Sequence, residues 1–154
     1  MDPIILCIIP ARSGSKGIVN KNIKDYKGKP LLAWSIQHAL SCDYKMRIIV
    51  STDSEEYAKI SRNYGAETPF LRPSNISDDN STTLECVQHC VEWLHLNENY
   101  KPDIILLLQP TTPNRDISDI NKCLKMFIDS RLQYDSLYSI TKVKQSPFKM
   151  LYLD

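Results

Sequence analysis

The sequence predicts an α/β protein with a doubly wound, mostly parallel sheet that carries helices on both faces. Short apolar runs, typical of strands buried on both faces, alternate with longer segments whose apolar residues recur at helical spacing. Helical connections between such strands imply parallel pairing and right-handed crossovers. A length of 154 residues corresponds to one domain, so we expect a single domain over residues 1–154.

Four segments are predicted to be strands. Ile4–Ile9 is a continuous apolar run between two prolines, and Met46–Val50 and Ile104–Leu108 have the same character. Asp135–Thr141 is predicted as the fourth strand. Ligands of doubly wound sheets bind outside the carboxyl ends of the strands, so the residues that follow these strands are candidates for a functional site.

The first two helices are predicted over Leu31–Leu40 and Glu55–Tyr64, each with an apolar stripe at helical spacing. Asp53 and Glu56 have the spacing of a capping box at the start of the second helix, and Gly65 would end it.

A polar segment, Arg72–Thr82, is predicted to be a loop, and Thr82 with Glu85 can form a capping box for the next helix. That helix is expected to bury one stripe, made of Leu84, Val87, Val91 and Leu94. A last helix is predicted from a stripe of Ile117, Ile120, Leu124, Phe127 and Ile128.

Composition and charge exclude several classes of protein. Nineteen Lys and Arg against eighteen Asp and Glu give a net charge of +1, which does not indicate nucleic acid or a membrane surface as a partner. The longest apolar run is too short to span a membrane, and no secretory signal is visible. Five cysteines without CxxC spacing predict free thiols and a cytoplasmic location, and no zinc site.

The loop after the first strand has the composition of a phosphate-binding loop. Two of the chain's four glycines, Gly14 and Gly17, lie there, and Arg12, Lys16 and Lys21 place three cations within ten residues. Glycines let backbone N–H groups approach phosphate oxygens, and cations balance their charge. The loop matches neither the Walker pattern nor GxGxxG, and a solvated basic loop is the alternative.

The other strand ends leave alternatives open. Asp53 follows a strand, where it could hold a metal or cap a helix. Gln109 also follows a buried strand directly, which favours contact with a ligand over a structural role. Taken alone, Arg72 could be a surface cation, and Ser81 and Thr83 could cap the helix that follows them.

Four segments together resemble the acylneuraminate cytidylyltransferases, which include the synthetases of CMP-sialic, CMP-pseudaminic and CMP-legionaminic acid. The resemblance extends from about Ile4 to Phe148. The segments are Ile9–Gly17 followed by Lys21-Asn22; Ile49–Asp53; Tyr64–Glu67 with Phe70–Pro73; and Leu107–Arg115, which contains Asn114 where the family usually has leucine.

The resemblance implies a Rossmann-like nucleotidyltransferase that transfers CMP from CTP to a nine-carbon 2-keto sugar acid with Mg²⁺, releases pyrophosphate and works as a homodimer. It implies that Arg12, Lys16 and Lys21 act on the triphosphate as the catalytic cations. The implied nucleotide-binding residues are Ala11, Arg12, Ser13, Gly14, Ser15, Lys16, Lys21, Asn22, Arg72, Ser81 and Thr83. Gln109 and Thr111 would face the sugar acid.

The family's members are longer, so we expect this chain to lack a C-terminal dimerisation portion and the acidic pair that holds Mg²⁺. No metal ligand is assigned within it, and the ion would be held mainly by phosphates and water. Two alternatives follow: a truncated module that binds CTP or CMP-sugar without catalysis, or a cytidylyltransferase for the eight-carbon acid Kdo. The latter enzymes carry an aspartate just after the glutamine, where Pro110 and Thr111 stand here.

Overall fold

The computed structural model describes residues 2–15 and 17–140, so Lys16 and the end of the fourth predicted strand lie outside the described residues. The chain divides into two compact units, residues 1–121 and 122–154. Its elements are β1 (Ile5–Pro10), η1 (Lys21–Ile23), β2 (Asp25–Tyr26), β3 (Lys29–Pro30), α1 (Leu31–Leu40), β4 (Met46–Ser51), α2 (Glu55–Asn63), η2 (Ser74–Ile76), α3 (Thr83–Glu98), β5 (Ile104–Leu107) and α4 (Ile117–Ser130).

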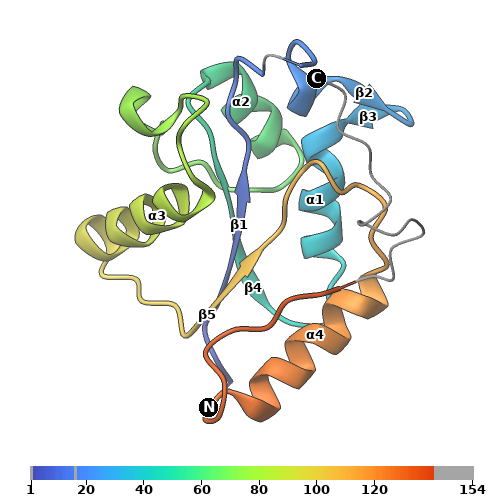
Figure 1. The fold of residues 1–154 in the computed structure, drawn as a ribbon, viewed down its shortest axis with the longest axis vertical. Helices are drawn as coiled ribbons and strands as arrows, with labels where there is room; N and C mark the ends of the chain where they lie inside the picture. Colours follow the sequence, from blue (N-terminus) through green and yellow to red (C-terminus); the bar gives the residue numbers. More distant parts are fainter. Residues whose placement is uncertain (1, 16, 141–154) are drawn as a thin grey trace, which may run out of the picture. The chain divides into compact units, whose positions relative to one another are not determined.

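A parallel sheet with the strand order β4-β1-β5 forms the centre of the first unit (Figure 1). Cys7 of β1 pairs with Ile48 on one side and with Leu106 on the other, and both pairings run parallel. The chain leaves β1 toward β4 and returns to its other side as β5, so the strand order switches at β1. The predicted doubly wound α/β class is confirmed.

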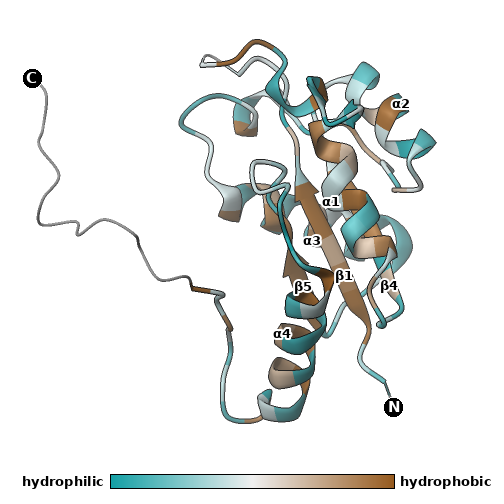
Figure 2. Cartoon of the chain, turned by 90° about the vertical axis from the view of Figure 1, so that its right-hand side faces the viewer, coloured by the Kyte–Doolittle hydropathy of each residue, from teal (hydrophilic) through white to brown (hydrophobic). Residues whose placement is uncertain are grey.

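The strand β1 is buried on both faces. Leu6 and Ile8 have no exposed surface and pack with Cys90 and Leu94 of α3, whereas α1 packs against β1 and β4. In Figure 1, α3 lies on one side of the strands and α1 on the other. Figure 2 shows β1 in the hydrophobic colour along most of its length, which agrees with the continuous apolar run that predicted a strand buried on both faces.

Helix α3 begins as predicted but buries a different stripe. Thr82 and Glu85 form the expected capping box. Leu84, however, is 63% exposed, and the fully buried positions are Cys86, Cys90 and Leu94. The predicted stripe was therefore wrong in its first residue. Leu94 has helical spacing both to the predicted stripe that begins at Leu84 and to Cys86 and Cys90, and the helix packs with the cysteines inward.

Two further expectations were wrong. Helix α2 is capped by Ser54, whose side chain accepts a hydrogen bond from the Tyr57 N–H, and not by Asp53. No strand forms over residues 135–140, the described part of the fourth predicted strand. Within the described residues, no helix is long and apolar enough to cross a membrane.

A short hairpin of β2 with β3 was not predicted from the sequence. Its turn residues Lys27 and Gly28 have φ values of 53° and 85°, a left-handed pair that suits a tight hairpin turn. Trp34 of α1 donates a hydrogen bond from Nε1 to the Tyr26 carbonyl at 2.8 Å. The hairpin is thereby fixed to the first turns of α1.

Candidate functional site

A pocket of about 540 Å³ opens at the carboxyl ends of β1 and β5, within the first unit. This is the edge of the sheet where the strand order switches, and ligands of doubly wound folds bind at such a point. The pocket is lined by Pro10, Arg12, Ser15, Gly17, Ile18, Lys21, Asn22, Arg72, Asp79, Ser81, Thr82, Thr83, Cys86, Gln109, Pro110 and Thr111.

Most of the residues singled out in the sequence meet at this pocket. The lining includes Arg12, Ser15, Lys21, Asn22, Arg72, Ser81, Thr83, Gln109 and Thr111. Ala11, Ser13 and Gly14 belong to the same loop but do not line it. Asp79, Thr82 and Cys86 were not expected there, and Asp79 lies in the polar segment whose sequence predicted only a loop.

The loop after β1 is held by its own polar groups. The buried amide of Asn22 donates from Nδ2 to the Arg12 carbonyl at 3.0 Å, so Asn22 orients the backbone of Arg12 as well as lining the pocket. Gly14 has a φ of 66°, and a left-handed backbone there costs glycine little. The Ala11 N–H donates to the Ser51 carbonyl at 2.9 Å, which ties the start of the loop to the end of β4.

Arg72 is a buried cation in the pocket wall. It is only 6% exposed, and it donates from NH2 to the Ser51 carbonyl at 2.5 Å and from Nε to Ser51 Oγ at 3.2 Å. Both partners are neutral, and no carboxylate of the described residues pairs with it. A buried charge without a counterion is costly, so this wall favours a ligand that carries negative charge or strong acceptors.

The other two described cations, Arg12 and Lys21, come from the loop and from η1. Arg12 reaches across the pocket to Asp79, with 2.5 Å between NH2 and Oδ1. The pocket thus holds three described cations and one lining carboxylate, and its charge favours an anionic ligand.

The start of α3 also lines the pocket, through Thr82 and Thr83. Hydrogen bonds from the Ser81 side chain and from the backbone N–H groups of Ser81 and Asn80 lower the pKa of Asp78. The N–H and the hydroxyl of Thr82 likewise lower the pKa of Glu85. Asp78 and Glu85 therefore accept the hydrogen bonds that stabilise the turn before α3, and this turn places Ser81 and Thr83 at the pocket.

Gln109 is fixed through its backbone and its side chain. Its carbonyl accepts a short hydrogen bond from Arg115 NH2, and its Nε2 donates to Thr83 Oγ1 at 3.3 Å. Arg115 also donates to Ser35 Oγ of α1 at 3.0 Å, and burial lowers the pKa of its guanidinium. Arg115 was not selected as a site residue, although it lies in the motif that follows β5.

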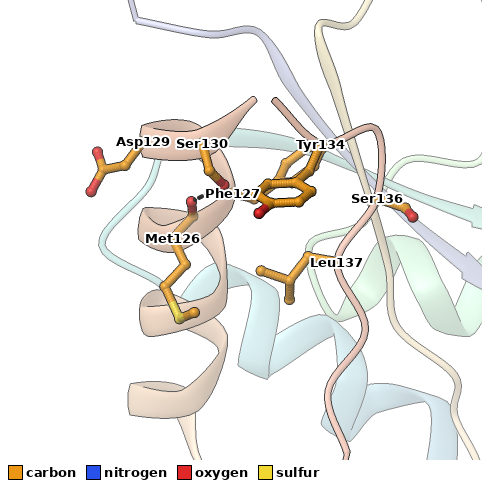
Figure 3. Close-up of a pocket in the computed structure, with 7 residues that line it drawn as sticks. All are labelled: Met126, Phe127, Asp129, Ser130, Tyr134, Ser136 and Leu137. Carbon is orange, nitrogen blue, oxygen red and sulfur yellow. Dashed lines mark hydrogen bonds between the residues drawn. The ribbon is translucent and has the colours of Figure 1, made fainter. Parts of the chain in front are cut away.

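A second cavity, of about 460 Å³, lies within residues 122–154 (Figure 3). It is lined by Met126, Phe127, Asp129, Ser130, Tyr134, Ser136 and Leu137. None of the described residues that line it is a cation, and its one carboxylate among them, Asp129, is paired to Lys125 at 2.9 Å. The first pocket is therefore the better candidate for an anionic ligand.

Among the described residues, no group of three or more His, Cys, Asp or Glu side chains could hold a metal ion. His38 and His89 lie on α1 and α3, and neither lines the pocket. The sequence predicted no metal ligand anywhere in the chain. Because residues 141–154 are not among the described residues, this stays a prediction for the whole chain.

The comparison with known proteins is specific about the family. A family profile described as "Cytidylyltransferase" matches residues 6–150. A pseudaminic acid cytidylyltransferase of Campylobacter jejuni subsp. jejuni serotype O:23/36 is 36% identical over 149 residues, covering 97% of this chain and 63% of the relative. An N-acylneuraminate cytidylyltransferase of Escherichia coli O18:K1:H7 is 39% identical over 138 residues, covering 90% of this chain and 31% of the relative.

Solved structures support the fold. The structure of CMP:2-keto-3-deoxy-manno-octonic acid synthetase complexed with CTP matches with a TM-score of 0.68 and 23% identity, over 83% of this chain and 48% of that one. The 4-diphosphocytidyl-2C-methyl-D-erythritol synthase structure matches with a TM-score of 0.63 and 11% identity, over 96% and 68%. The chain spans 63% of the length of the C. jejuni relative.

Proposed function

The chain belongs to the cytidylyltransferase family, and on that premise we propose that its pocket takes part in the transfer of CMP from CTP to a nine-carbon 2-keto sugar acid. The family resemblance drawn from the motifs is confirmed by the match over residues 6–150. The relatives named for pseudaminic and N-acylneuraminic acid, together with a CMP-N,N'-diacetyllegionaminic acid synthase of Legionella pneumophila that is 34% identical, support the substrate class.

The observation that carries the proposal is the convergence of Arg12, Lys21 and Arg72 on one pocket at the carboxyl ends of the strands. A triphosphate needs cations for its charge and backbone donors for its oxygens, and the loop after β1 supplies both. Lys16, whose placement lies outside the described residues, is proposed as a further cation of that loop on the sequence alone.

Each wall of the pocket has a proposed role. Arg12 and Lys21, with Ser15 and the backbone of Gly14, hold the triphosphate. Ala11 and Ser13, whose N–H groups donate to the Ser51 carbonyl and to Asp53 Oδ1, fix the loop together with Asn22. Arg72, Ser81 and Thr83 lie against the cytidine, where hydrogen bonds select cytosine over uracil. Gln109 and Thr111 face the sugar acid.

The proposed reaction is an in-line displacement. The anomeric hydroxyl oxygen of the sugar acid attacks the α-phosphorus and releases its proton to solvent, while the bond from that phosphorus to the bridging oxygen breaks and pyrophosphate leaves. Arg12 and Lys21 balance the charge that builds on the departing pyrophosphate, and Gln109 holds the attacking sugar in place. The step requires no covalent intermediate with the protein.

Magnesium is implied by the family, but the described residues do not make a protein site for it. Asp53, Asp78 and Glu85 all accept hydrogen bonds from neighbouring groups, and Asp79 is paired with Arg12. Mg²⁺ bound to nucleotide phosphates keeps several waters and needs one or two protein carboxylates at most. No step of the reaction is therefore assigned to a metal held by these residues.

A second candidate is a module that binds CTP or CMP-sugar without turnover, which is favoured by the lack of a magnesium-binding carboxylate set among the described residues. For the whole protein, we propose a homodimer in the cytoplasm on family grounds, and sedimentation of the purified protein tests the dimer.

The test is an assay of pyrophosphate and CMP-sugar formation with CTP, Mg²⁺ and a panel of sialic, pseudaminic, legionaminic and eight-carbon acids. We expect product with one nine-carbon acid and its loss in Lys21→Ala. CTP binding without pyrophosphate release would identify the binding module, product with the eight-carbon acid would identify the Kdo alternative, and the absence of CTP binding would contradict both readings of the pocket.

A further inference from the structure

Asp53 links the end of β4 to the loop after β1. Its Oδ1 accepts a hydrogen bond from the Ser13 N–H at 2.7 Å, and its Oδ2 accepts one from Ser13 Oγ at 2.8 Å. Forty residues separate the two in sequence, and both are half-buried. Hydrogen bonds to an ionised carboxylate are stronger than neutral ones, and a two-point attachment fixes direction as well as distance.

The two residues before Asp53 hold Ala11 of the loop and Arg72 of the pocket wall. The Ser51 carbonyl accepts hydrogen bonds from the Ala11 N–H at 2.9 Å and from Arg72 NH2 at 2.5 Å. The Thr52 carbonyl accepts one from the Arg72 N–H at 2.7 Å. Three consecutive residues at the end of β4 therefore attach the phosphate loop on one side and the buried Arg72 on the other.

Neither of the roles considered for Asp53 from the sequence fits these contacts. Ser54 caps α2, so Asp53 is not needed there. Both of its carboxylate oxygens accept hydrogen bonds from Ser13, which leaves it poorly disposed to ligate a metal, and it does not line the pocket. Its contacts are with the residue between Arg12 and Gly14, at the point where the loop turns into its left-handed conformation.

We infer that Asp53 is a positioning residue for the phosphate loop, which acts through Ser13 to hold Arg12 and the loop backbone in the conformation that receives a triphosphate. The inference rests on the proposed function and deepens it. A loop held in its binding conformation before the ligand arrives loses less conformational entropy on binding, so the attachment contributes to affinity without touching the ligand.

The charge of Asp53 gives the test a direction. If its carboxylate acted on the ligand through its charge alone, Asp53→Asn would remove an anion near the phosphates and tighten their binding. If it positions the loop, the same variant places an amide N–H or a weaker acceptor against Ser13, and phosphate binding weakens. The two roles predict changes of opposite sign.

The experiment is calorimetric binding of three ligands, CTP, inorganic tripolyphosphate and cytidine, to the full chain. For Asp53→Asn we expect about a tenfold higher Kd for CTP and for tripolyphosphate, from the loss of one or two charge-assisted hydrogen bonds, and an unchanged Kd for cytidine. Ser13→Ala should give part of that loss and Ser13→Thr should restore it. Combining Asp53→Asn with Ser13→Ala should add little, because both break the same attachment.

Asp103→Asn is the matched control. Asp103 accepts the Ile4 N–H at 2.7 Å at the opposite end of β1, so it tests the loss of a carboxylate acceptor away from the pocket. Unchanged or tighter tripolyphosphate binding in both Asp53→Asn and Ser13→Ala overturns the inference, and so does an equal loss for all three ligands. Wild-type chain that binds tripolyphosphate but not CTP contradicts the proposed function and leaves the test of Asp53 intact.

Discussion

The ion pair between Arg12 and Asp79 crosses the pocket and competes with any phosphate that Arg12 would bind. The two side chains come from loops 67 residues apart, and 2.5 Å separates NH2 from Oδ1. In the proposed complex a triphosphate takes the place of the Asp79 carboxylate. We therefore predict that Asp79→Asn, which keeps the shape and removes the charge, binds CTP more tightly than the wild type.

The exposure of the pair sets the size of the effect. The side chains are 30% and 33% exposed, so solvent screens their attraction and the net worth of the pair is about 0.2–1 kcal/mol. A ligand that must break the pair recovers that amount when Asp79 is neutral. The expected gain is about 0.2–1 kcal/mol, or about 1.4- to fivefold in Kd, and it shrinks as salt rises.

Calorimetric titration with CTP at two salt concentrations measures this change. Glu55→Gln is the matched control, since it breaks the exposed pair of Arg62 and Glu55, also at 2.5 Å, away from the pocket. Weaker CTP binding by Asp79→Asn, with the control unchanged, would contradict a competition between Asp79 and the phosphates, because the carboxylate would then assist the ligand or its cation.

Three further predictions concern stability and reactivity. Burial lowers the pKa of His38 and of His89, so the folded state binds fewer protons than the unfolded state below about pH 6.5. Stability should therefore fall from pH 7 to pH 5 by urea denaturation, and the double substitution of both histidines by Gln should flatten that dependence; an unchanged slope would contradict it. Thr82→Ala removes the capping box of α3 and should lower the free energy of unfolding by about 1 kcal/mol, whereas Thr82→Ser should keep most of the stability. Equal urea midpoints for the Ala variant and the wild type would argue against the cap. All five thiols are free, and only Cys42 and Cys123 are partly exposed, so a thiol reagent should modify these two in the native protein and the other three after denaturation. Cys42 should react more slowly because burial raises the pKa of its thiol. Fast reaction of all five thiols in the native protein would contradict the burial of the other three.

The three strands of the parallel sheet and most helix limits were predictable because they depend on local patterns. The apolar run between two prolines at β1 is typical of a buried strand, and the spacing over Leu31–Leu40 is typical of a helix. The buried stripe of α3 was not predictable, because Leu84 and Cys86 are two residues apart and lie on opposite sides of the helix, and only the packing against β1 decides which side is buried. The hairpin of β2 and β3 has two residues in each strand, too few for any periodic signal.

The pocket was predictable from strand ends and motifs, but its internal attachments were not. Arg12, Lys21 and Gln109 follow strands or lie in the loop that does, so their convergence follows from the topology. The partners of Asp53 and Asp79 lie 40 and 67 residues away, and no local pattern contains that information.

Thermal stabilisation of the chain by CTP, UTP, ATP and GTP, each with and without Mg²⁺, tests whether the pocket binds a cytidine triphosphate. A ligand at about a hundred times its Kd adds about 2.7 kcal/mol to the native state, an easily measured shift. We expect CTP to stabilise the chain more than UTP and the purine nucleotides do, and we expect Lys21→Ala to reduce that stabilisation. No shift with any nucleotide, or equal shifts with all four, would contradict a cytidine triphosphate pocket built from these residues.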